Sequence, residues 1–355
     1  MKDNPASDYL FVNEQHPVPA QTPDLEAQVS QFLSLPPSSE PPVDTIWIFS
    51  FGTWDIWKLA AMPLQSGEKV VDAMATHIFD KIEFLYRKSL DPSSIAFSNF
   101  WSDSTEEEFK TLADPDAGAE VDRRKLESFR VLVPQLLDVS LTPGWHNRAP
   151  PSVPHTSAEQ LRNSALLTER WNSRIREHMN SWTEKRQASP EGIEDGSPAN
   201  NADKAPKAGS WSETRASILR DADPEKEKPF DANVVYAPFP QRLGLHSKPA
   251  DVILETMKEE EMQRDSLADS QGHGTVSEDD ALRFSDVWTA CVPNNPHAAE
   301  EESAVQISGE CQVPDQHLFY TSFTVGQRAI DELAKLTADA VLEGLIIPPS
   351  ASRKA

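Results

Sequence analysis

Two cysteines and two histidines in the C-terminal third are the residues whose types best suit a metal ion. Cys291, His297, Cys311 and His317 form a C-x5-H…C-x5-H pattern, and thiolate sulfur and imidazole nitrogen are the usual ligands of structural zinc. Such sites generally hold their paired ligands about two to four residues apart. The wider spacing favours a disulfide or two free thiols. No Walker, G-x-G-x-x-G or H-E-x-x-H motif occurs either, so we expect neither a metal ion nor a cofactor.

A cluster of aromatic side chains surrounds one glycine at the end of an apolar run. The cluster comprises Trp47, Gly52, Trp54, Asp55 and Trp57. Ligands of open α/β sheets bind beyond the carboxyl ends of the strands, so these tryptophans could line a ligand pocket. Tryptophans more often belong to a core, which is the simpler interpretation. The aspartate at the same place could orient a catalytic group or cap the next helix, and both interpretations stay open.

Alternating strands and helices must position these residues. Residues 45–51 are β-branched and aromatic, nearly continuously apolar and closed by Gly52, which predicts a strand buried on both faces. A second strand is predicted at 129–134 and a weaker third at 233–236. Apolar residues at helical spacing predict helices at 25–33, 68–90, 157–182 and 326–345, and a strongly acidic helix is predicted at 250–268. This order of elements predicts an α/β domain with a parallel sheet and right-handed crossovers.

Two of these helices carry patterns that predict which face is buried. The helix at 157–182 has one apolar stripe, formed by Leu161, Ala165, Trp171, Ile175, Met179 and Trp182. The helix at 250–268 carries an acidic run at 259–261. Because like charges repel one another, this run predicts a solvated helix face.

The charge balance and the hydropathy pattern exclude several classes of partner. The chain has 355 residues with 57 acidic and 33 basic side chains, a formal net charge of −24. This field would repel a phosphate backbone, so we expect no nucleic-acid partner. No apolar run of about 18 residues occurs, which predicts no membrane span. The N-terminal residues lack the apolar core of a secretion signal, so the chain as written is predicted to be cytoplasmic; a longer natural N-terminus with a leader would make it secreted or lumenal.

Composition divides the chain into one α/β domain in two parts and three further segments. The domain parts are 24–182 and 229–347. The tail at 1–23 and the insertion at 183–228 are predicted to be disordered, because their polar, Pro-rich sequence cannot bury enough apolar surface to offset the entropy of ordering. Residues 348–355 form a short C-terminal tail.

The apolar run and the glycine after it resemble a known family block. Residues 46–55, IWIFSFGTWD, are similar to the third conserved block of the SGNH hydrolases, also called GDSL lipases or esterases, where a buried strand precedes Gly-x-Asn-Asp. The likeness continues in chain order at 132–137, 171–172, 284–288 and 314–320. The resemblance implies a three-layer α/β/α, flavodoxin-like parallel sheet and acyl-ester hydrolysis by Ser, His and Asp with an oxyanion hole.

Most of the catalytic positions of that family carry other residues here. Gly52 and Asp55 match, whereas Trp54 stands at the oxyanion-hole Asn, and Thr321 and Thr324 stand at the Asp and His of the final Asp-x-x-His. No Gly-Asp-Ser block precedes residue 45, so the serine nucleophile is missing. The resemblance therefore implies an ester-hydrolase domain that is catalytically degenerate or N-terminally incomplete.

Two other hypotheses keep a function for the same fold. One is an active esterase with an unorthodox site that uses Ser50 or Ser322 with His317, although Ser50 is expected inside the strand and in the core. The other is a non-catalytic module that binds an ester, lipid or glycan ligand, or a protein, at the tryptophan cluster or through acidic segments.

The family topology also predicts an exposed sheet edge. Its strand order is 2-1-3-4-5, and this chain begins before strand 3, which leaves the strand at 46–51 at the edge. An apolar, unpaired edge strand favours pairing with another chain. We therefore expect self-association or a partner at this edge, or a natural chain with more N-terminal sequence.

Overall fold

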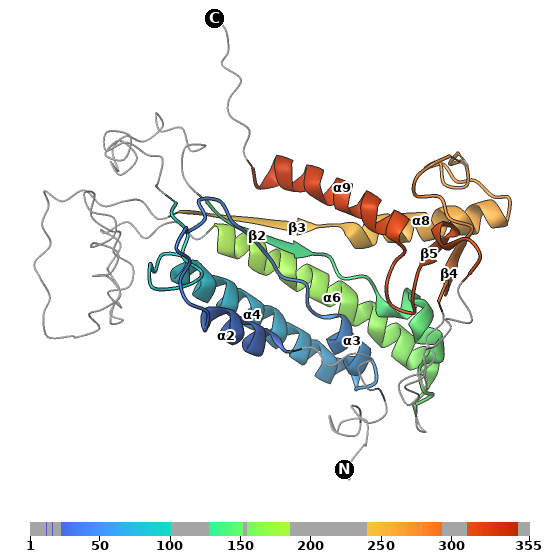
Figure 1. The fold of residues 1–355 in the computed structure, drawn as a ribbon. Coiled ribbons are helices and arrows are strands. Elements are labelled where there is room, and N and C mark those ends of the chain that lie inside the picture. The colour runs from blue at the N-terminus through green and yellow to red at the C-terminus, as the bar shows by residue number, and fades with distance from the viewer. Residues whose placement is uncertain are drawn as a thin grey trace, which may run out of the picture.

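The computed structural model describes Val12, His16 and several stretches of the chain. The stretches are 23–100, 128–151, 155–184, 240–277, 279–292 and 311–346. Within them the chain is an α/β protein of helices and small parallel sheets (Figure 1). The predicted strand at 233–236, residues 185–228 of the predicted insertion, His297 and most of both tails lie outside the described residues. In the described part, no helix is long and apolar enough to cross a membrane.

Three strands form a parallel sheet, which confirms the predicted sheet type. Their order is β1 (Ile46–Ile48), β2 (Ser128–Pro134) and β3 (Gln241–Ser247). The central strand buries Phe129, Val131 and Val133 on one face. The third strand is β3 and does not come from the segment predicted for it.

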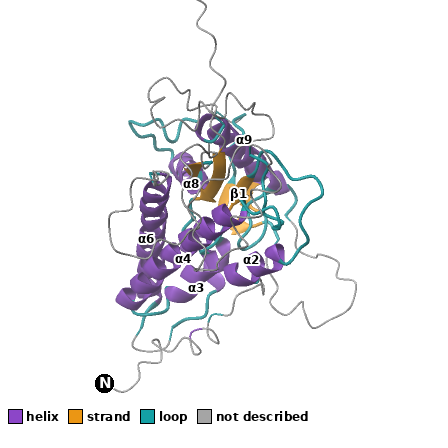
Figure 2. Cartoon of the chain, turned by 90° about the vertical axis from the view of Figure 1, so that its left-hand side faces the viewer, coloured by secondary structure: helices purple, strands orange, loops and turns teal. Residues whose placement is uncertain are grey.

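Helices lie on both sides of this sheet. The helices among the described residues include α2 (Leu25–Leu33), α3 (Thr53–Leu59), α4 (Leu64–Lys88), α6 (Ser157–Thr183) and α9 (Gln327–Gly344), and α8 (Pro249–Arg264), which lies beyond the end of β3. The five predicted helices are confirmed, and α3 is an addition. Figure 1 shows α2, α4 and α6 on one side of the sheet and α9 on the other, and Figure 2 places β1 between α9 and the layer of α2, α3 and α4.

The two sides of the sheet are packed to different degrees. On the α4 and α6 side a large core includes Phe129, Ile82, Trp171 and Trp182, each at most 2% exposed. On the other side the end of α9 approaches β2 and β3, where the Arg130 Nε donates to a backbone oxygen of residue 345 at 3.0 Å. The main core therefore lies under the helical layer of α4 and α6.

A second, smaller sheet joins the C-terminal elements. Strands β4 (Asp286–Ala290) and β5 (His317–Phe319) are parallel, and their core is formed with α8 and α9 by Ile253, Met257, Phe284, Val287, Leu318, Phe319 and Ala329. A disulfide between Cys291 and Cys311 links the end of β4 to the segment that enters β5. Of the two alternatives for the cysteines, the structure has the disulfide.

The prediction that the first strand is buried on both faces is wrong. The strand is shorter than predicted, and Ile46 and Ile48 are 40% and 64% exposed. The end of α9 covers β3 and Arg130 rather than β1, so the side chains on this face of β1 stay uncovered. Ser50 is also exposed and lies beyond the strand, not in the core. Among the described strands, β1 is at the edge of its sheet, as the family topology implies.

Candidate functional site

Aromatic side chains from three distant segments meet beyond the carboxyl ends of β1 and β2. We call Trp54, Trp57, Trp145 and Phe323 the strand-end cluster. The Phe323 ring centroid lies 4.9 Å from that of Trp54 and 5.4 Å from that of Trp57, and Trp57 lies 5.6 Å from Trp145. All these pairs are edge-to-face, a favourable geometry for aromatic rings. The cluster thus joins the loop after β5 to the segments that follow β1 and β2.

Local geometry explains how each segment reaches the cluster. Gly52 ends the turn after β1 with φ +115° and begins α3, which carries Trp54 and Trp57. After β2, two short 3-10 helices, η4 (Val139–Leu141) and η5 (Pro143–Asn147), place Trp145. The backbone N–H of Gly144 donates to the backbone carbonyl oxygen of Ser322 at 2.8 Å. This bond holds the loop that carries Phe323 against η5.

The turn that holds Thr321 and Thr324 contacts α3 through the ring of Phe323. Thr321 and Thr324 close a tight turn, in which the backbone N–H of Thr321 donates to the backbone carbonyl oxygen of Thr324 at 3.2 Å. Phe323 lies inside this turn and packs on Trp54. Trp47, in contrast, stacks on Phe129 with centroids 5.9 Å apart. Trp47 is therefore not part of the strand-end cluster. Trp57 and Trp145 of that cluster are buried in the same main core, at 6% and 8% exposed.

Asp55 lies in the first turn of α3, where a negative charge interacts favourably with the helix dipole. Desolvation by the surrounding protein raises the pKa of its carboxyl above the usual value, and Lys58 opposes this rise. The residue is nevertheless exposed, and within the described residues no imidazole or hydroxyl group hydrogen-bonds to it. It has the position of a helix-terminal acid and not that of the orienting acid of a triad.

The alternative serine and histidine pairs are not assembled in the described residues. The His317 Nδ1 lies 3.5 Å from the Thr289 oxygen and 3.8 Å from the Asp286 carboxylate, against β4. Ser322 is 3% exposed, and no hydrogen bond joins the His317 ring to it or to Ser50. An imidazole must contact the hydroxyl that it activates, so this geometry does not support a hydrolytic dyad.

A polar face of α6, which the sequence analysis missed, supports the strand-end loops. The predicted stripe is wrong in the N-terminal half of the helix, where Leu161 is 50% exposed and Ala165 is exposed. Beside Leu167, the residues buried there are polar: Gln160, Asn163, Ser164 and Thr168. The Asn163 amide donates to the oxygens of Ala60 and Met62 at 3.2 and 3.1 Å. Loop carbonyls need donors, which is why polar side chains replace apolar ones on this face.

Asn172, nine residues after Asn163 on α6, completes this support. Its side-chain amide donates to the Leu136 oxygen at 2.9 Å and accepts the Leu136 N–H at 2.8 Å. The buried polar residues of α6 recur every three or four positions, next to Leu167 and Trp171. This spacing is a sequence signal that could have identified the face.

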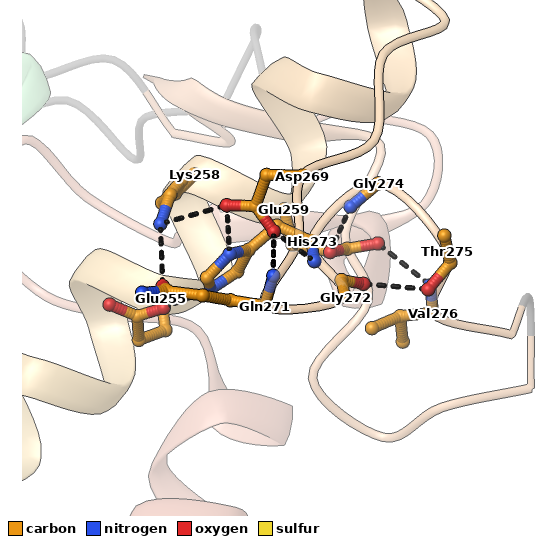
Figure 3. A network of polar contacts seen from close by, with 10 residues as sticks. All are labelled: Glu255, Lys258, Glu259, Asp269, Gln271, Gly272, His273, Gly274, Thr275 and Val276. Carbon is orange, nitrogen blue, oxygen red and sulfur yellow. Dashed lines mark hydrogen bonds and ion pairs between the residues drawn. The ribbon is translucent and has the colours of Figure 1, made fainter.

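A second polar cluster surrounds His273 in the loop after α8 (Figure 3). Its Nδ1 contacts the Asp269 carboxylate at 2.7 Å, and its Nε2 contacts Glu255. Both ring nitrogens therefore face carboxylates, and hydrogen bonds to Asp269 and then to Glu255 raise the pKa of His273. An imidazole engaged on both nitrogens has no free nitrogen to act as a general base, so the cluster orders the loop.

The acidic run on α8 is not a solvated face, so that prediction is wrong for Glu259. This residue is 7% exposed, and its carboxylate accepts the N–H groups of Gly274 and Val276 at 2.5 and 2.9 Å. These hydrogen bonds lower the pKa of the carboxyl against the effect of its burial. The carboxylate can be buried because backbone N–H groups of the loop hydrogen-bond to it. No pattern in the sequence predicts these bonds.

We expect the loop around His273 to loosen as the pH rises. Because folding raises the pKa of His273, its two contacts are complete below the ordinary histidine pKa of about 6.5 and weaken as the pH passes through the folded value. Amide NMR shifts of Gly274 measured against pH should report a midpoint above the ordinary value. The His273→Gln variant should remove this titration, and a midpoint below the ordinary value would contradict the arrangement.

No arrangement in the described residues suits a metal ion. Cys291 and Cys311 are joined in a disulfide, and disulfide sulfur is not the thiolate that zinc prefers. The fourth member of the predicted pattern, His297, lies outside the described residues.

No protein family, curated protein or solved structure matches this chain. Function must accordingly be inferred from the residues and their geometry.

Proposed function

We propose that this chain is an SGNH-like α/β/α domain, related to carboxylic-ester hydrolases, that does not hydrolyse esters itself. The observation that carries the proposal is the turn from Thr321 to Thr324, which stands where the family has its Asp and His. In this turn Phe323, and not an imidazole, packs on the strand-end cluster. The order of β1, β2 and β3 agrees with family strands 3, 4 and 5.

The chemistry of these positions supports the proposal. Ester hydrolysis by this route needs an imidazole to take the proton of a serine hydroxyl. Threonine hydroxyls at both positions titrate too far from neutral pH to replace it. Trp54 supplies one indole N–H, whereas an oxyanion hole needs several donors aimed at the developing charge.

A panel of p-nitrophenyl esters from acetate to octanoate tests the proposal. We expect the purified full chain to release p-nitrophenol at the buffer rate, with no saturation by substrate. The matched control is His317→Ala, because the alternative active site depends on this imidazole. Saturable turnover that the His317→Ala variant loses would contradict the proposal and support an unorthodox esterase.

A further inference from the structure

Arg148 packs against two tryptophans of the strand-end cluster, and within the described residues it has no counter-ion. Its guanidinium carbon is 4.4 Å from the Trp57 ring centroid and 4.6 Å from that of Trp145. The Arg148 Nε donates to the Gln160 Oε1 at 2.8 Å. Both terminal nitrogens are buried, and within the described residues neither has a hydrogen-bond partner. Burial of an unpaired cation is costly, so this arrangement needs an explanation.

Arg242 shows how the same protein satisfies a similar arginine. Its guanidinium carbon lies 4.1 Å from the Tyr86 ring centroid. The Arg242 Nε and one terminal nitrogen donate to the Glu83 carboxylate at 3.2 and 3.1 Å. Within the described residues Arg148 has the aromatic contacts but no carboxylate partner, and burial lowers the pKa of its guanidinium to about 9.

The other groups without partners near Arg148 are also donors. Because the Gln160 oxygen accepts from Arg148, the amide nitrogen of Gln160 faces the His16 Nε2 at 3.4 Å. That ring nitrogen must then accept, which leaves the His16 proton on Nδ1. The His16 Nδ1 and the Trp57 Nε1 are both buried without a partner among the described residues. The missing component is therefore an acceptor.

The charge of this group of side chains selects the kind of acceptor. Burial, with Arg148 close by, lowers the pKa of His16 to about 4, so this imidazole is neutral near pH 7. Arg148 is thus the single positive charge, and a monoanion balances it. The two terminal nitrogens form a planar fork that matches a carboxylate. A phosphate at neutral pH carries about −1.5 to −2 charges and would leave excess negative charge buried.

We propose that Arg148 anchors a binding site for a small organic monocarboxylate at the strand-end cluster. The guanidinium fork of Arg148 holds the carboxylate, and the His16 Nδ1–H and the Trp57 Nε1–H are further donors close by. The indole rings that pack beside the guanidinium favour a ligand whose carboxylate is attached to an aryl or short acyl group. The site needs no hydrolytic step, so it does not depend on the proposed absence of esterase activity.

Calorimetric titration of the full chain tests the site with sodium phenylacetate and sodium butyrate as probes. Phenylacetamide and butyramide have nearly the same shapes without the charge, and inorganic phosphate is the anion that should bind less well. Arg148→Gln should weaken carboxylate binding by about tenfold or more, because hydrogen bonds to a charged group are lost. The matched control is Arg162→Gln, an exposed arginine of α6, which should leave the affinity unchanged.

The stability of the variant separates loss of the site from loss of the fold. Arg148→Gln removes an unpaired buried charge, so without ligand it should melt at or above the temperature of the original chain. If it unfolds instead, Arg148→Lys keeps the charge but lacks the fork, and it should also weaken binding. The proposal is overturned if neither carboxylate binds, if the amides or phosphate bind as well as the carboxylates, or if folded Arg148 variants keep full affinity.

Discussion

Replacement of Phe129 by alanine should lower the free energy of unfolding by about 3–5 kcal/mol. Phe129 lies on the central strand β2 and is fully buried. Its ring stacks on Trp47 and meets the rings of Tyr86 and Trp182 edge-to-face, with centroids 5.4 and 6.1 Å away. The residues that surround it come from β1, α4 and α6, so the cavity cannot close through the movement of one element. Cavities of this kind keep most of their cost.

Urea unfolding followed by tryptophan fluorescence measures this loss. The matched control is Phe84→Ala, because Phe84 lies on α4 and is 40% exposed. A surface substitution of this kind should change stability by about 1 kcal/mol or less. If Phe129→Ala does not fold, Phe129→Leu should give a smaller loss that remains measurable. If Phe129→Ala and Phe84→Ala lose the same free energy of unfolding, β2 does not lie at the centre of a closed core.

The sequence predicts the elements whose side chains repeat with a regular period. Helices α4 and α9 follow apolar spacing, and β2 is rich in apolar residues apart from Ser128 and Arg130, so the sequence predicts each within a few residues. Strand β3 has no such signal, because Gly244 takes the place of an apolar residue. A side chain there would meet the Met179 sulfur of α6 at 2.0 Å. Close approach of a helix, which a single sequence does not reveal, removes the alternation that predicts a strand.

The candidate site is less predictable because its contacts join distant segments. Trp54 and Trp57 were identified by their place after a strand, and this part of the site follows from sequence. Phe323 lies more than 260 residues further along the chain, so no local pattern connects it to them. Arg148 carries no sequence signal, because its guanidinium packs against Trp57 and Trp145, which follow different strands, and its terminal nitrogens have no partner in the described residues.

Replacement of Gly52 by alanine should destabilise the fold by about 2–5 kcal/mol through two separate effects. The first is backbone strain, because Gly52 has φ +115°, which residues with a side chain rarely adopt. The second is crowding, because an added Cβ would lie 2.9 Å from the Trp171 ring and 3.2 Å from the Leu136 Cδ2. Trp171 is 1% exposed in the main core, so its ring has little room to move.

Gly272→Ala is the control that separates these effects. Gly272 also has positive φ, at +96°, but an added Cβ there would meet only the Thr275 hydroxyl, at 3.9 Å. This variant should therefore lose only the backbone contribution, about 1–3 kcal/mol, in the same urea experiment. The larger loss at Gly52 should appear together with a change in the near-UV circular dichroism of the tryptophans. Equal losses at the two glycines would mean that Trp171 can move, and that the turn after β1 does not fix the strand-end cluster.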